Sequence, residues 1–110
     1  MRYLQFKQHY FVVGRRVLSR NLRIIGGGNL ALFNSMEQAS GYVTTWATER
    51  RQLAVHMGIG TVKVGSDVIF DLEPEAKSGS RVRTVQLILP DNTREEIFIE
   101  RWQIWEGTTA

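Results

Sequence analysis

One stretch of this chain, residues 35–56, carries side chains at the spacing of a single helical face, and strand-like runs flank it on both sides. The positions of this face recur three or four residues apart, as they do on an amphipathic helix. They are Met36, Ala39, Val43, Trp46, Ala47, Arg50, Leu53 and Ala54. We therefore expect one amphipathic helix over about 35–56, with Val43, Trp46 and Leu53 on its buried face.

The sequence also marks both ends of this helix. Asn34 can serve as the N-cap, and Glu37 follows three residues later, as in a capping box. Gly58 lies just after the last apolar position, where a glycine commonly ends a helix. The helix therefore has a predicted start and a predicted stop.

The remainder of the chain predicts short β-strands separated by turns. Before the helix, the expected strands are 3–6, 10–13, 16–18, 22–25 and 30–33; after it they are 61–64, 67–72, 82–89 and 96–105. Gly14 is interpreted as a bulge or turn, the glycine-rich run 26–29 as a hairpin turn, and residues 90–92 as a second turn. The fold class is therefore α+β. It combines a small N-terminal antiparallel sheet, the helix, and a C-terminal antiparallel β-meander or partly open barrel.

Length and composition limit the possibilities further. A chain of 110 residues is expected to form a single domain over 1–110, here with a β-rich and helical half, 1–57, and a β-meander half, 58–110. The absence of cysteine excludes disulfides and thiolate metal sites, and it suits a reducing compartment. The sequence has no apolar run of membrane-spanning length and no segment typical of a secretory signal. A cytoplasmic location and no membrane partner are the resulting expectations.

The two halves differ strongly in charge. The first 36 residues carry six basic side chains and no acidic one, whereas nine of the eleven acidic residues follow position 66. Residues 1–55 have a formal charge of +6 and residues 56–110 a formal charge of −3, which the net charge of +3 conceals. A region of one sign can attract phosphates or an acidic protein surface.

This asymmetry nominates candidate binding residues. The basic candidates for contact with nucleic acid or another anionic partner are Lys7, Arg15, Arg16, Arg20 and Arg23. The aromatic candidates for base stacking or an interface are Tyr3, Tyr10, Trp102 and Trp105. The same residues are also explained if the aromatic rings belong to the core and the arginines form a solvated rim, so both interpretations stay open.

No catalytic or metal-binding motif is complete in the sequence. The triple glycine lacks the lysine of a phosphate-binding loop. His9 and His56 are too few for a zinc site, and no cysteine can complete one. The acidic residues of 67–75 lack the spacing of a calcium-binding loop. We expect neither enzymatic activity nor a cofactor or metal.

Together these observations favour a small intracellular, non-enzymatic binding or regulatory module. Its basic N-terminal face would contact nucleic acid or an acidic protein surface. The alternative is a structural homo-oligomer, in which the basic half of one subunit meets the acidic half of the next. A small enzyme is the less favoured third class.

Overall fold

The computed structural model describes the backbone of residues 3–73 and 76–109 and the side chains of residues 8–73 and 76–103. Within these ranges it contains five strands and one helix. They are β1 (Tyr3–Leu18), β2 (Ile24–Phe33), α1 (Met36–His56), β3 (Lys63–Ile69), β4 (Ser80–Ile88) and β5 (Arg94–Thr109). Among the described residues, no helix is both long enough and apolar enough to cross a membrane.

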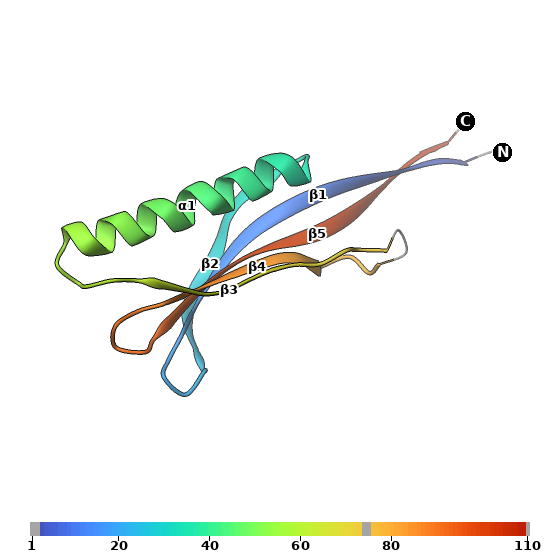
Figure 1. The fold of residues 1–110 in the computed structure, drawn as a ribbon. Coiled ribbons are helices and arrows are strands. Elements are labelled where there is room, and N and C mark those ends of the chain that lie inside the picture. The colour runs from blue at the N-terminus through green and yellow to red at the C-terminus, as the bar shows by residue number, and fades with distance from the viewer. Residues whose placement is uncertain (1–2, 74–75, 110) are drawn as a thin grey trace.

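All described strands belong to one antiparallel sheet with the order β2-β1-β5-β4-β3, and α1 lies across one of its faces (Figure 1). The predicted α+β class is confirmed, and β3, β4 and β5 form the expected meander without closing into a barrel. The two expected sheets are in fact continuous. β1 joins them, because it pairs with β5 from Tyr3 opposite Thr109 to Leu18 opposite Arg94.

The predicted hairpin turn at 26–29 is wrong, because these residues lie within β2. The chain turns earlier, where the Ser19 N–H donates to the Arg23 carbonyl oxygen at 2.8 Å. Gly27, with φ of +139°, lies against the backbone of β1, and a Cβ there would collide with the Arg15 carbonyl oxygen. Glycine is needed here for close approach between two strands rather than for a turn. Gly14 marks an irregularity as expected, since the β1–β2 register shifts beside it.

Several predicted strands are parts of longer ones. The expected strands 3–6, 10–13 and 16–18 all lie within β1, and the expected strands 61–64 and 67–72 both overlap β3, which runs through the turn predicted between them.

The predicted helix agrees with the structure except at its ends. α1 begins at Met36, and its N-cap is Ser35, whose Oγ accepts a hydrogen bond from the Gln38 N–H at 3.2 Å. The expected cap at Asn34 is therefore wrong by one residue. Ser35 has the extended backbone that a cap needs, with φ of −132° and ψ of 148°. The helix ends before Gly58, which adopts a positive φ of 71° as expected.

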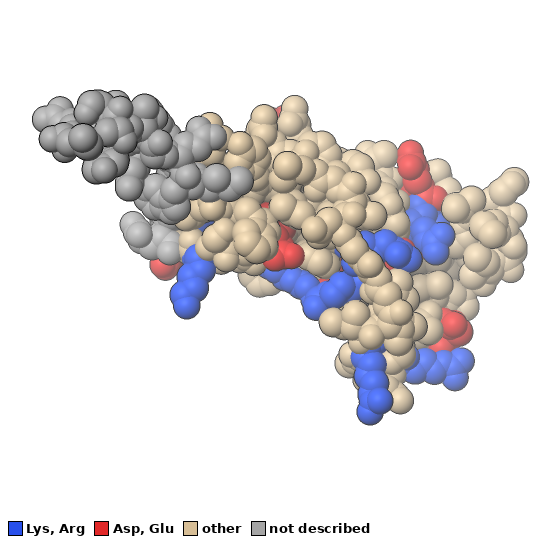
Figure 2. Space-filling model, turned by 180° about the vertical axis from the view of Figure 1, so that it is seen from behind, with Lys and Arg blue, Asp and Glu red and all other residues tan. Residues whose placement is uncertain are grey.

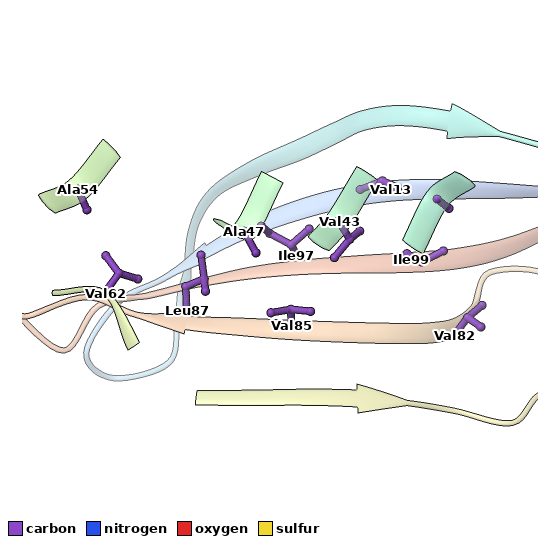
Figure 3. Close-up of a cluster of buried hydrophobic side chains, with 11 residues drawn as sticks. Val13, Val43, Ala47, Ala54, Val62, Val82, Val85, Leu87, Ile97 and Ile99 are labelled. Atoms are coloured by element: carbon purple, nitrogen blue, oxygen red, sulfur yellow. The ribbon is translucent and has the colours of Figure 1, made fainter. Parts of the chain in front are cut away.

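The hydrophobic core lies between α1 and the sheet (Figure 3). The helix contributes small buried side chains, which allow it to lie close to the strands. The core includes Ala39, Val43, Ala47 and Ala54 from α1, and Val13, Val85, Leu87, Ile97 and Ile99 from the sheet. Val43 is buried as predicted and Trp46 is half-buried, but Leu53 is 45% exposed. Leu53 lies about 100° around the helix from Ala54, and Ala54 is the residue that faces the core.

β1 and β5 continue beyond their neighbours and lengthen the molecule to 64 Å, against 26 and 22 Å in the other directions. β2 pairs with β1 from Phe11 onward, and β4 pairs with β5 as far as Arg101. Beyond these positions, the described parts of β1 and β5 pair only with each other, so the start of β1 lies beside the end of β5 (Figure 1).

Candidate functional site

Arg15 and Arg16, two residues of the predicted basic face, are engaged in ion pairs with carboxylates of β5. Arg15 Nε lies 2.5 Å from Glu95 Oε1, and Arg16 Nη2 lies 2.7 Å from Glu96 Oε1. Neighbouring residues of a strand point to opposite faces of the sheet, so the two pairs lie on different faces. Part of the positive charge of the first half is therefore neutralised by the second half of the same chain.

Glu95 lies on the face that α1 covers and is only 2% exposed. Its second carboxylate oxygen accepts a hydrogen bond from Arg50 Nε of the helix at 3.0 Å. One buried carboxylate thus connects β1, β5 and α1. A buried charge of this kind is stable only while its partners are in place.

Glu96 lies on the open face of the sheet, where Arg81 Nη1 also contacts its Oε1 at 2.7 Å. The guanidinium groups of Arg81 and Arg16 flank the ring of Phe98, with their central carbons 4.3 and 5.2 Å from its centroid. The ring also covers Gly14, where an added Cβ would come within 2.5 Å of it. Phe98 is therefore 7% exposed on the face that the helix does not cover, shielded by a glycine and two cations.

Two other basic candidates lie at the hairpin between β1 and β2. Arg20 and Arg23 are exposed, and Arg20 Nε donates to the Asp91 carbonyl oxygen at 2.7 Å. Figure 2 shows the Lys and Arg side chains of the rear surface as separate groups on a mostly uncharged background, several of them beside carboxylates. The basic candidates whose side chains are described do not form one face. The exposed ones among them, Arg20 and Arg23, lie at the hairpin.

Two of the aromatic candidates are neighbours, because Tyr10 of β1 lies directly opposite Trp102 of β5. Tyr10 is half-buried, and its hydroxyl donates to Gln8 Oε1 at 2.5 Å. Trp102 is 44% exposed on β5, next to Gly79 of the loop before β4. The side chains of Tyr3, Lys7 and Trp105 lie outside the described residues.

The acidic stretch after residue 66 contains a structural ion pair. Arg83 donates to both carboxylate oxygens of Asp67, at 3.0 and 2.8 Å, and also to the Ser40 and Thr44 hydroxyls of α1. This hydrogen bonding, reinforced by the charge of Arg83, holds the pKa of Asp67 below its ordinary value of 3.8. The described residues include no group of three His, Asp or Glu side chains that could hold a metal ion, and Glu75 is not among them.

The sequence interpretation did not identify the exposed apolar side chains of the two edge strands. Of the fourteen large hydrophobic residues exposed in the described structure, half lie on β2 and β3. They are Ile24, Ile25, Leu30, Leu32, Val64, Val68 and Ile69. One signal for them was present in the sequence, because residues 24–33 contain no charged side chain. The run instead predicts two short strands around a turn.

A second apolar region lies at the C-terminal end of α1. Leu53, Val55, Met57 and Ile59 are all exposed there. Two depressions, of about 430 and 530 Å³, lie beside this part of the helix. The larger is lined by Trp46, Glu49, Arg50, Gln52, Leu53 and His56. Arg50 is already paired with Glu95. The region therefore offers a partner apolar surface rather than an unpaired arginine from this position.

Comparison with known protein families, with curated proteins and with solved structures found no match to this chain.

Proposed function

We propose that this chain is a non-enzymatic binding module that acts through protein–protein contacts at the edges of its sheet. The observation that carries the proposal is the concentration of exposed apolar side chains on β2 and β3. These side chains lie at the two opposite edges of the sheet, and exposed apolar surface is a common feature of interaction sites. An edge strand also offers backbone N–H and C=O groups, which a partner strand can pair with.

The charge arrangement also favours a protein over nucleic acid as the partner. A phosphate-binding face needs several cations that converge on one backbone. Arg15 and Arg16 are already held by Glu95 and Glu96. Among the candidates whose side chains are described, this leaves Arg20 and Arg23 exposed. Two arginines at a hairpin suit contact with an acidic patch of a protein beside the apolar edge.

The same ion pairs bear on the alternative of assembly through opposite-charge halves. Glu95 and Glu96 would have to receive the basic half of a neighbouring subunit. Each already contacts two arginines of its own chain. The apolar edges therefore support association better than the net charges of the halves do.

Site-specific photo-crosslinking in the producing cells tests the proposal. A benzophenone-bearing amino acid is placed at Ile25 on β2, at Ile69 on β3, and at the exposed helix residue Thr45 as the control. We expect adducts with polypeptide from at least one edge position and few from Thr45.

Two crosslinking results would contradict the proposal, and a further position tests nucleic acid as the partner. Equal yields from all three positions, or no polypeptide adduct from either edge, would contradict the proposal. A fourth position, Arg23, reports on nucleic acid. Nuclease-sensitive adducts from this position without protein adducts from the edges would favour a nucleic-acid-binding hairpin instead.

A further inference from the structure

We propose that the partner of β2 is the β2 strand of a second copy of this chain, paired antiparallel about a two-fold axis. The sheets of both copies would then form one continuous sheet. This inference rests on the proposed function, since it names the protein that covers one of the two apolar edges.

The first argument is that β2 lacks the charges and prolines that commonly protect an edge strand. Natural edge strands carry charges, prolines or bulges that prevent pairing with another chain. β3 follows this rule with Lys63, Asp67 and a register shift between Val64 and Ser66. β2 also has register shifts, but its ten residues include no charge and no proline. Of the two edge strands, β2 is therefore the one better suited to pair with a strand of another chain.

The second argument concerns strand direction. Every neighbour in the order β2-β1-β5-β4-β3 is antiparallel, so the two edge strands β2 and β3 run in the same direction. Side-by-side repetition of the subunit in one orientation would thus pair β3 with β2 in parallel. Parallel sheets are normally covered on both faces, whereas antiparallel sheets tolerate one open face.

α1 covers only one face of this sheet (Figure 1). Pairing of β2 with its own copy about a two-fold axis keeps the extended sheet antiparallel. Such self-complementary dimers are the commonest symmetric assemblies.

The third argument is charge complementarity at the ends of the strand. Antiparallel pairing places the start of each β2 beside the end of the other. The exposed Arg20 and Arg23 precede the strand, and the exposed Glu37 follows it in the first turn of α1. Each end of the paired strands would thus bring basic groups of one copy near an acidic group of the other, with no charge in between.

Sedimentation equilibrium of the purified full chain tests the inference, with the dimer expected at twice the 12.6 kDa of the chain. Leu32 and Val68 offer a matched pair, because both are exposed and both lie on the open face, one on each edge. Antiparallel pairing places Leu32 near the start of β2 in the second copy. Leu32→Lys therefore adds a positive charge close to Arg23 of that copy and should raise the dimer dissociation constant by about 100-fold. Val68→Lys adds the same charge at the other edge and should leave the constant unchanged.

A charge exchange keeps the test decisive if Leu32→Lys fails to fold, which circular dichroism would reveal. Glu37→Arg should weaken the dimer by about 5- to 10-fold, and addition of Arg23→Glu should restore it. A monomeric wild-type chain, or dissociation by Val68→Lys but not by Leu32→Lys, would overturn the inference. Mass spectrometry of the Ile25 adducts separates this outcome from failure of the proposed function. Adducts with a different protein reject self-pairing alone, whereas no protein adduct from either edge rejects both.

Discussion

Glu95 and Glu96 are neighbours in β5, yet they meet their arginines in two different surroundings. On the covered face, α1 encloses Glu95, whose side chain is 3% exposed between Arg15 and Arg50. On the open face, Arg16 and Arg81 themselves enclose Glu96, whose side chain is 12% exposed. The same type of ion pair is thus buried in one case by a layer of helix and in the other by neighbouring side chains.

The difference shows what the charge asymmetry of the chain contributes to folding. A carboxylate under a helix cannot be solvated if a partner is lost, whereas one on an open face can regain water when its neighbours move. Both pairs link the first half of the chain to the second. Part of the separation of charge along the sequence is therefore offset by ion pairs once β1 and β5 pair.

The largest expected effect is a difference in stability between variants of Glu95, on the covered face, and Glu96, on the open face. Glu95→Ala leaves Arg15 and Arg50 without their carboxylate under the helix, and should lower the free energy of unfolding by about 3 kcal/mol. Glu96→Ala should cost about 1–2 kcal/mol, because water can replace part of the lost contact. Urea denaturation measures both. The exposed Glu49→Ala serves as the control and should stay within about 0.5 kcal/mol of the wild type. An equal or reversed order for Glu95 and Glu96 would show that the helix does not control the cost.

A smaller effect distinguishes paired from exposed arginines. Arg15→Gln and Arg16→Gln together should lower the free energy of unfolding by about 2 kcal/mol, since each removes an ion pair with a poorly exposed carboxylate. Arg20→Gln and Arg23→Gln together remove the same charge from the hairpin and should cost less than about 0.5 kcal/mol each. Thermal or urea unfolding provides the measurement. If both double variants were equally stable, the ion pairs of Arg15 and Arg16 would contribute nothing to folding.

The smallest expected effect concerns acid. The pKa of Asp67 is lowered in the folded chain by its hydrogen bonds from Arg83. Its contribution to stability is therefore complete above its unfolded pKa and is lost as pH falls through the lower, folded value. Asp67→Asn should make the unfolding free energy less dependent on pH between about pH 5 and about pH 2. Denaturant titrations across this range give the slope, and an unchanged slope in the variant would disprove the role of this pair.

The basic hairpin illustrates how far the candidate site could be predicted. The sequence predicts Arg20 and Arg23 as binding residues because no acidic residue lies near them along the chain, and both are exposed in the structure. It could not separate them from Arg15 and Arg16. The glutamates that bind those two lie 80 positions away, and strand register brings them together.

The apolar edge strand β2 also could not be recognised from the sequence alone. The uncharged run 24–33 was visible in the sequence, and its glycines were interpreted as a turn. Only the pairing with β1 reveals that Gly27 is required by a backbone that passes close to it. Which strand lies at an edge depends on the order of the whole sheet.

The sequence by itself determined the helix over nearly its full length, the α+β class and the C-terminal meander. Helical periodicity, caps and turns depend on residues a few positions apart, so they can be read locally. The tertiary structure decided that β1 and β5 pair, that Ala54 rather than Leu53 faces the core, and that Glu95 and Glu96 hold arginines on opposite faces. These outcomes depend on contacts between residues far apart in the chain, whose register and face are set only when the strands come together.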